Sequence, residues 1–206
     1  NQSRALPLGE AAVTGSGTAS SPGQEYLLTV QGLLARLATD EWAHIQAAAH
    51  LIAEAIADGH VLHAFGSGHS HMLAEELFYR AGGLVNVRPI LFDGLMLHAS
   101  ARLSTSLERL PGLADALLTD HGVSPGDVLI VASNSGGNAV ATELVRSAQH
   151  QGVHVIALTS VNHATSAAAR VGRGAKIHEL ADVVIDNGGV VGDAAVSIRG
   201  FARKVA

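Results

Sequence analysis

Apolar residues recur at three- and four-residue spacing over residues 25–58. The stripe consists of Leu27, Val30, Leu34, Leu37, Ile45, Ala48, Ile52 and Ile56, with Glu41 as its one charged member. Such spacing gives an α-helix one apolar face, and Gly59 ends the pattern as a helix terminus would. The pattern therefore predicts one long or two consecutive amphipathic helices. A stripe of this length needs a covering surface, and we expect either the sheet or a second subunit to supply it.

Beyond Gly59, short apolar runs alternate with helical patterns. The predicted strands are Val61–Phe65, Val85–Leu91, Val128–Ala132, Val153–Thr159 and Val183–Asp186. The predicted helices are Met72–Ala81, Leu107–His121 and Ala139–Gln151, and the segment 94–106 fits either a helix or an active-site loop. Continuously apolar strands that alternate with helices are typical of an α/β protein whose parallel sheet is covered on both faces.

The ends of the chain and its lack of linkers define the expected domains. Residues 1–24 are rich in Gly, Ser, Thr and Ala without periodicity, which predicts a flexible leader, and they lack the apolar core of a signal peptide. No Gly/Pro-rich linker divides the remainder, so residues 25–206 are expected to form a single domain that begins with the helices over 25–58. We expect a cytoplasmic protein.

Composition excludes several classes of protein. With 48% hydrophobic and 15% charged residues, the body of the chain is not intrinsically disordered. No apolar run approaches the ~18 residues of a membrane helix, so we expect no membrane partner. The absence of Cys excludes disulfides, thiolate metal sites and cysteine nucleophiles. The net charge of −5 disfavours nucleic acid as a direct partner, because proteins that bind the phosphate backbone carry a basic surplus.

Two predicted strands end in similar loops. Phe65 is followed by Gly66, Ser67, Gly68, His69 and Ser70, and Ala132 is followed by Ser133, Asn134, Ser135, Gly136, Gly137 and Asn138. Glycine lets the backbone approach a ligand, and serine hydroxyls and helix N-terminal amides donate hydrogen bonds to anionic oxygens. Ligands of open parallel sheets bind at the carboxyl ends of the strands. The pair of loops therefore predicts a phosphate site built from neutral donors.

Each loop alone also suits a plain connection with a serine N-cap, but together they hold more serines than two caps require. The common nucleotide-binding motifs fit poorly. The chain has no GxxxxGK(S/T), and the first loop lacks the third glycine of GxGxxG.

The stretches 65–83, 128–160 and 181–194 resemble the sugar isomerase (SIS) domain family, most closely its bacterial phosphosugar and phosphoheptose isomerases. The similarity covers about 27–197. It implies a three-layer α/β/α sandwich with a five-stranded parallel, flavodoxin-like sheet, and a homo-oligomer (dimer or tetramer). It also implies a sugar-phosphate ligand. We expect no cofactor. The implied ligand-binding residues are Gly66, Ser67, Gly68, Ser70, Ser133, Asn134, Ser135, Gly136, Asn138, Thr159 and Ser160, with Ser70, Ser133, Ser135 and Asn138 around the phosphate.

An aldose–ketose isomerase needs a base beside the carbonyl carbon and an acid at the carbonyl oxygen. By resemblance, Glu76 matches the second glutamate of the Ala-Glu-Glu-Leu motif of phosphoheptose isomerases, where it is the base. Here that motif lies four residues closer to the glycine loop, and a solvated helix charge is the alternative role. His163, just after Ser160, and His69, in the first loop, are candidates for the acid, as is a histidine from a neighbouring subunit.

Other polar residues receive structural interpretations. His69 and His71 alternate as metal ligands can, but no HExxH motif or third spaced ligand accompanies them, so we predict no metal site. Glu143 is expected on a solvated helix face. The cluster 186–189 and Gly192-Asp193 follow the last strand and fit either a wall of the pocket or turns of the chain. Turns are the favoured interpretation, so both aspartates are left out of the catalytic prediction.

These observations predict a sugar-phosphate isomerase that interconverts aldose and ketose phosphates. Two alternatives stay open: a non-catalytic regulatory module that senses a phosphosugar, and a lyase or etherase that acts on an amino-sugar phosphate.

Overall fold

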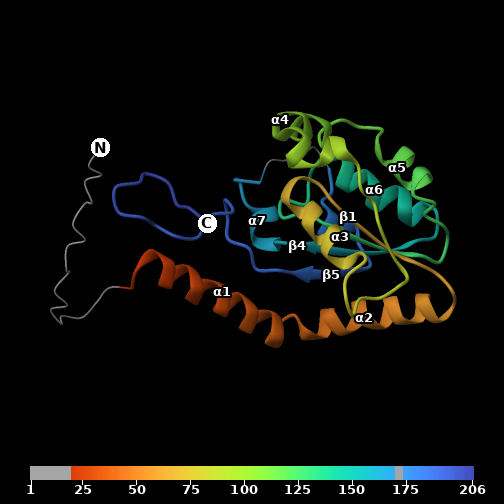
Figure 1. Ribbon diagram of the computed structural model, residues 1–206, viewed down its shortest axis with the longest axis horizontal. Coiled ribbons are helices and arrows are strands. Elements are labelled where there is room, and N and C mark those ends of the chain that lie inside the picture. The colour runs from red at the N-terminus through yellow and green to blue at the C-terminus, as the bar shows by residue number, and fades with distance from the viewer. Residues whose placement is uncertain (1–19, 170–173) are drawn as a thin grey trace, which may run out of the picture.

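Five parallel strands form one sheet in the computed structural model, which describes residues 20–169 and 174–206 (Figure 1). The strands are β1 (Leu62–Gly66), β2 (Val87–Pro89), β3 (Val128–Ala132), β4 (His154–Thr159) and β5 (Val183–Asp186). Their order is β2-β1-β3-β4-β5, and every neighbouring pair is parallel. This is the flavodoxin-like order, in which the direction of winding reverses between β1 and β3. The predicted fold class is confirmed, and both predicted loops leave strands at this reversal.

The central strand β3 is apolar throughout because both faces of the sheet are covered there. In β3, Val128 and Ile130 belong to one apolar cluster, whereas Leu129 and Val131 belong to the other. Successive side chains of a strand point to opposite faces, so one continuous apolar run serves two cores. The edge strand β2 is shorter than the predicted Val85–Leu91.

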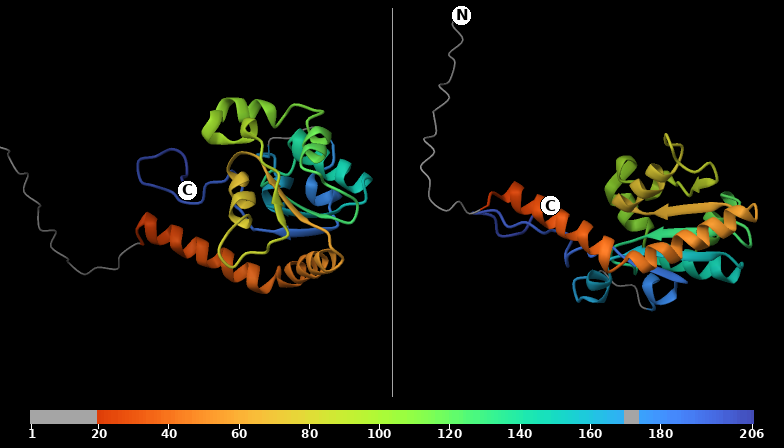
Figure 2. Two further views of the ribbon diagram at one scale, coloured as in Figure 1. Left: turned by 45° about the vertical axis from the view of Figure 1, so that its right-hand side comes forward. Right: turned by 90° about the horizontal axis from the view of Figure 1, so that it is seen from below.

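The described helices form two layers around the sheet (Figures 1 and 2). Side chains of α2 (Trp42–Ala57) and α3 (His71–Leu77) pack on one face. On the other face lie α5 (Ala114–Asp120), α6 (Ala139–His150) and α8 (Ile177–Leu180). The remaining elements are α1 (Pro22–Thr39), α4 (Leu97–Leu107), α7 (Val161–Thr165) and two short 3₁₀ turns, η1 (Gly68–Ser70) and η2 (Asp93–Leu95).

Two predicted helices are wrong in extent. The helix expected over Leu107–His121 is only α5, which begins at Ala114, because α4 ends at Leu107 and a break separates the two helices. Pro111 disfavours helical backbone at the residue before it, and Gly112 has a φ of +89°. The segment 94–106, left open between helix and loop, is mostly helix α4. The helix expected over Met72–Ala81 ends at Leu77, and Tyr79 takes a left-handed φ of +49°.

The apolar stripe over 25–58 forms two consecutive helices that break at Asp40 and Glu41. Helix α1 already begins at Pro22, where Ser21 and Gln24 form a reciprocal capping box, so the end of the expected leader is helical. Residues 1–19 of that leader lie outside the described residues. No helix in the described ranges has both the length and the apolar character needed to cross a membrane.

Helix α1 extends past the edge of the body and has no buried residue (Figures 1 and 2). Tyr26, Leu27, Leu28 and Leu34 are exposed along it. Within the described chain, the sheet therefore covers α2 but leaves the stripe of α1 open.

Candidate functional site

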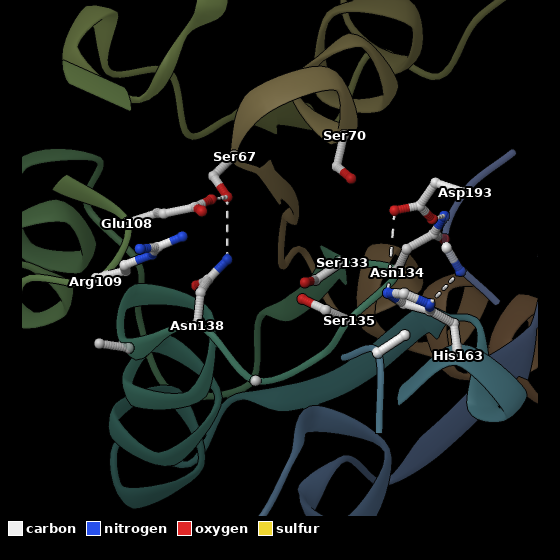
Figure 3. Close-up of a pocket in the computed structure, with 14 residues that line it drawn as sticks. Ser67, Ser70, Glu108, Arg109, Ser133, Asn134, Ser135, Asn138, His163 and Asp193 are labelled. Atoms are coloured by element: carbon white, nitrogen blue, oxygen red, sulfur yellow. Dashed lines mark hydrogen bonds and ion pairs between the residues drawn. The ribbon is translucent and has the colours of Figure 1, made fainter. Parts of the chain in front are cut away.

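A cavity of about 870 Å³ opens at the carboxyl ends of β1, β3 and β4. Three serines lie in its centre: Ser70, Ser133 and Ser135 (Figure 3). One wall carries Ser67, Glu108, Arg109 and Asn138, and the opposite wall carries Asn134, His163 and Asp193. The cavity thus joins both predicted loops to residues from three further segments.

The serine hydroxyls are free to donate hydrogen bonds. Among the described residues, the hydroxyls of Ser70 and Ser135 have no protein partner. The Ser133 hydroxyl accepts a bond of 3.2 Å from the Gly136 N–H, which leaves its own proton available. Figure 3 shows the three side chains directed into the same space. Together they offer three neutral donors to one anionic group.

Glycines bring the serines to this position. A Cβ on Gly66 would overlap the backbone of Ser70, so only glycine lets the first loop fold this tightly. Gly136 takes a φ of +62°, and a Cβ there would lie 3.2 Å from Ile177. These two glycines and Gly68 shape the loops, although none of the three lines the cavity itself.

One wall is held by a chain of side-chain hydrogen bonds. The Ser67 hydroxyl donates to Oε2 of Glu108 at 3.1 Å and accepts from Nδ2 of Asn138 at 3.2 Å. The other amide atom of Asn138, Oδ1, caps α6 by accepting from the Ala141 N–H at 2.8 Å. Asn138 therefore lines the cavity with an amide whose nitrogen and oxygen both already form hydrogen bonds within the protein.

The opposite wall centres on His163, which is buried on α7. The Gly192 N–H donates to its Nδ1 at 3.0 Å. Because Nδ1 is an acceptor, the neutral ring carries its proton on Nε2. Nε2 lies 4.0 Å from Oδ2 of Asp193, whose Oδ1 accepts from Nδ2 of Asn134 at 3.0 Å. His163 therefore presents an N–H beside a carboxylate.

Thr159 and Ser160 stand behind this wall and do not line the cavity. The Thr159 hydroxyl donates to the Ser133 carbonyl at 2.7 Å. The Ser160 hydroxyl donates to the Gly189 carbonyl at 2.6 Å and accepts from the His163 N–H at 3.1 Å. Their place in the structure is to fix the serine loop and α7 rather than to face the cavity.

Asp186 ties the end of β5 to this region. Burial raises the pKa of its carboxyl, but hydrogen bonds from the N–H groups of Gly188 and Val161 and from Arg36 outweigh burial. The pKa is held below its usual value, so the group is an anion at neutral pH.

Glu76 and His69, predicted as base and acid, do not line the cavity. The Glu76 side chain is 67% exposed and pairs with Arg80 one helical turn away. It lies six residues after Ser70, and six residues do not make a whole number of helical turns. His69 is exposed, whereas His71 is buried and donates from Nδ1 to the Gly66 carbonyl at 2.9 Å. Glu143, expected to be solvated, accepts from the Gly112 N–H at 2.8 Å.

Two charged residues of the cavity were not predicted from the sequence: Glu108 and Arg109. They were hidden inside the single helix expected over 107–121, whereas they stand in the break after α4. Asp193, left open between the pocket wall and a turn, lines the cavity and also takes a left-handed φ of +60°. Within residues 20–169 and 174–206, no three His, Asp or Glu side chains are grouped so that they could hold a metal ion.

Comparison with known proteins gives the family. Residues 25–160, more than half of the chain, match the SIS domain family. A UPF0309 protein of Halalkalibacterium halodurans is 47% identical over 160 residues, covering 78% of this chain and 66% of the relative. A UPF0309 protein of Brucella ovis is 44% identical over 181 residues, covering 88% of this chain and 72% of the relative. The chain thus spans about two thirds of the length of these relatives.

Solved structures share the fold at low sequence identity. A phosphoheptose isomerase from Francisella tularensis is 16% identical, with a TM-score of 0.57 over 80% of this chain and 81% of its own. A phosphoheptose isomerase from Neisseria gonorrhoeae is 20% identical, with a TM-score of 0.55 over 81% of this chain and 86% of its own. The sugar isomerase domain of an RpiR transcription factor from Sphaerobacter thermophilus is 20% identical, with a TM-score of 0.51 over 85% and 80%. With its family match and its five-stranded parallel sheet, the chain belongs to the SIS domain family.

Proposed function

We propose that the cavity binds a sugar phosphate and that the protein interconverts its aldose and ketose forms. The observation that carries the proposal is the convergence of the Ser70, Ser133 and Ser135 hydroxyls at the reversal point of the sheet. Three neutral donors suit the several oxygens of one phosphate group. They also suit a protein with a net charge of −5, because no basic patch is required.

The walls supply what isomerisation needs beyond binding. The Nε2–H of His163 is a proton donor for a carbonyl oxygen, and the cavity also contains the carboxylates of Glu108 and Asp193. A cavity of about 870 Å³ has room for an open-chain sugar phosphate beside these groups. Phosphoheptose isomerases among the similar structures agree with this chemistry.

A non-catalytic sensing module is the second candidate. It is favoured by the position of Glu76, the carboxylate that resemblance suggested as base, outside the cavity. A sugar isomerase domain from a transcription factor is also among the similar structures. The etherase or lyase alternative uses the same phosphate site. Because the chain spans about two thirds of the length of its relatives, the activity of the whole protein is part of this proposal.

The three functions give different products from one assay. The purified protein is incubated with a panel of aldose and ketose phosphates and amino-sugar phosphates, and the products are followed by NMR and mass spectrometry. An isomerase yields a new sugar phosphate of unchanged mass. A lyase or etherase yields fragments of lower mass, and a sensing module yields binding without product. Cleavage, or binding without conversion on every sugar, would contradict the isomerase proposal.

The assembly and location belong to the same proposal. The uncovered stripe of α1 fits a homo-oligomer in which a second copy covers it. A phosphorylated sugar is a charged metabolite that does not cross bilayers unaided, and this supports the proposal of a cytoplasmic activity.

A further inference from the structure

Glu108 is a cavity carboxylate that hydrogen bonds hold at both its backbone and its side chain, and its role is not assigned by the fold or by the motifs. Resting on the proposed isomerisation, we propose that Glu108 is the base that moves the proton between the two reacting carbons. Ser67 is a positioning residue that holds Glu108 in place, and Asn138 holds Ser67 in turn. Glu76 then has no part in the chemistry.

The backbone of Glu108 is fixed from two sides. Its N–H donates to the Ser104 carbonyl at 3.0 Å, which closes the last turn of α4. Its carbonyl accepts from the Val140 N–H at 3.2 Å, in the first turn of α6. The helix that follows the serine loop therefore also sets the position of Glu108. A carboxylate held in this way keeps a constant relation to the phosphate donors, as a proton-transferring group requires.

The side chain of Glu108 is oriented by one oxygen and leaves the other available. Oε2 accepts from the Ser67 hydroxyl at 3.1 Å, and Ser67 accepts from Nδ2 of Asn138 at 3.2 Å. Because Oδ1 of Asn138 caps α6, its Nδ2 is the atom that faces Ser67. Within the described residues, Oε1 has no hydrogen-bond partner. One carboxylate oxygen is anchored and the second is free to take a proton.

Glu76 offers the opposite arrangement. Its carboxylate is exposed and paired with Arg80, so it is solvated and partly neutralised. Glu108 is half-buried at the cavity wall, where it shares the space with Arg109 beside it and with His163 and Asp193 opposite. Figure 3 shows Glu108 and His163 on opposite sides of the three serines. A sugar whose phosphate binds those serines can meet a base on one side and an acid on the other.

The proton transfers balance within these two residues. Oε1 of Glu108 removes the proton from the carbon beside the carbonyl, and the C–H electron pair forms the C=C bond of an enediol. The π pair of the C=O bond moves onto the oxygen, which takes the Nε2 proton of His163. The deprotonated Nε2 then accepts the proton of the neighbouring hydroxyl, and that group becomes the new carbonyl. Glu108 returns its proton to the adjacent carbon. Both side chains end in their starting states, and no cofactor or co-reactant is consumed.

The test compares Glu108→Gln with Glu76→Gln, the same change on a carboxylate outside the cavity. Two properties are measured with each sugar phosphate: thermal stabilisation on binding, and uptake of solvent deuterium at the carbon beside the carbonyl by NMR. We expect Glu108→Gln to keep the thermal shift and lose deuterium uptake by about 100-fold or more, whereas Glu76→Gln keeps both. The fold-change is read relative to the wild-type protein.

The outcomes separate the two proposals. Absence of any thermal shift with wild-type protein overturns the proposed function. A thermal shift with near wild-type deuterium uptake in Glu108→Gln overturns the role of Glu108 alone, as does loss of uptake in Glu76→Gln only. If the wild-type protein binds a sugar phosphate but shows no deuterium uptake, the isomerase chemistry and the role of Glu108 are overturned, and only the proposed binding site stands.

Ser67→Ala tests the positioning role. Loss of the hydroxyl removes the hydrogen bond that orients Oε2 of Glu108. We expect turnover to fall while KM changes little, because the base is displaced and the phosphate donors stay in place. Ser67→Thr, which keeps a hydroxyl, is expected to restore turnover. Unchanged turnover in Ser67→Ala, or an equal loss in Ser67→Thr, would overturn the positioning role.

Discussion

The guanidinium of Arg36 binds the carboxylate of Asp186, with 2.7 Å between Nη2 and Oδ2. Nη1 also donates to the Asp186 carbonyl at 3.0 Å. Arg36 lies in the last turn of α1, and Asp186 ends β5. The pair therefore fastens the projecting helix to the carboxyl edge of the sheet, beside the wall that holds His163.

This pair makes stability depend on pH in the acidic range. The pKa of Asp186 is lowered in the folded protein, because hydrogen bonds from Gly188, Val161 and Arg36 exceed the opposing effect of burial. A lowered pKa contributes stability above the unfolded value of about 3.9, and the contribution is lost as pH falls through the folded pKa. We expect Asp186→Asn to lower the free energy of unfolding at pH 7 by about 1–2 kcal/mol. The difference from wild type should shrink below about pH 4.

Urea unfolding at pH 7 and pH 3.5 measures this difference. Arg36→Gln should lower the free energy of unfolding at pH 7 by a similar amount. The double variant should lose less than the sum of the two single losses, because both changes break the same ion pair. Arg102→Gln, at an exposed arginine of α4, is the matched control. Strict additivity of Arg36→Gln and Asp186→Asn would contradict the pairing.

His63 gives a pH dependence nearer to neutrality. Burial lowers its pKa, and the hydrogen bond between its Nε2 and Asp127 at 3.1 Å opposes burial without cancelling it. The unfolded chain therefore binds a proton more readily below about pH 6.5, so stability falls as pH falls through this window. His63→Gln keeps a donor for Asp127 but cannot titrate. We expect it to flatten the decline in unfolding free energy between pH 7.5 and 5.5, measured by urea unfolding, and an unchanged decline would contradict the role of His63.

Gly136 is expected to matter for both the fold and the cavity. Its φ of +62° is unfavourable for other residues, and a Cβ would crowd Ile177 at 3.2 Å and Thr159 at 3.4 Å. Gly136→Ala should lower the unfolding free energy by about 1–2 kcal/mol and weaken ligand binding. Gly32→Ala is the control, since Gly32 is helical with nothing within 4 Å of its Cβ position. Control and variant should change stability in opposite directions, because alanine favours a helix interior by up to about 1 kcal/mol over glycine.

The open face of α1 predicts self-association. Leu27 and Leu34, two turns apart on the stripe of this helix, are each 60% exposed, which is a poor arrangement for a helix that stands alone in water. If a second copy covers them, Leu27→Gln with Leu34→Gln should shift sedimentation towards the monomer. Leu103→Gln, 49% exposed on α4, should leave the assembly unchanged. A monomeric wild-type protein at micromolar concentration would contradict this prediction.

Strands and glycine loops could be predicted from the sequence because their signals are local. Each strand is rich in apolar residues, as strands of a sheet covered on both faces are, and β3 and β5 have the predicted bounds. The loops were marked by glycines and serines at the ends of those strands. The boundary between α1 and α2 was harder to predict, because the apolar spacing continues on both sides of Glu41 and only this one charged residue interrupts it.

The charged walls of the cavity could not be predicted in the same way. Glu108 meets Ser67 across 41 positions of sequence, and Asn134 meets Asp193 across 59. These contacts depend on how α4 and the segment after β5 return to the serine loop, which no local pattern encodes. Glu76 failed to reach the cavity for a local reason, since its spacing from Ser70 turns it away around α3. Pro111 and Gly112 were the available signals for the break that exposes Glu108.

The central claim is that Ser133 and Ser135 help to bind the phosphate of a sugar phosphate, and a thermal-shift titration tests it most directly. Wild-type protein, Ser133→Ala/Ser135→Ala and the control Ser106→Ala, on exposed α4 surface, are titrated with sugar phosphates and the matching free sugars. A ligand at 100 times its Kd should stabilise wild-type protein by about 2.7 kcal/mol. We predict stabilisation of wild type and Ser106→Ala by a sugar phosphate but not by its free sugar, with the effect lost in the double variant. Equal stabilisation of the double variant, or none of wild type by any sugar phosphate, would contradict the account.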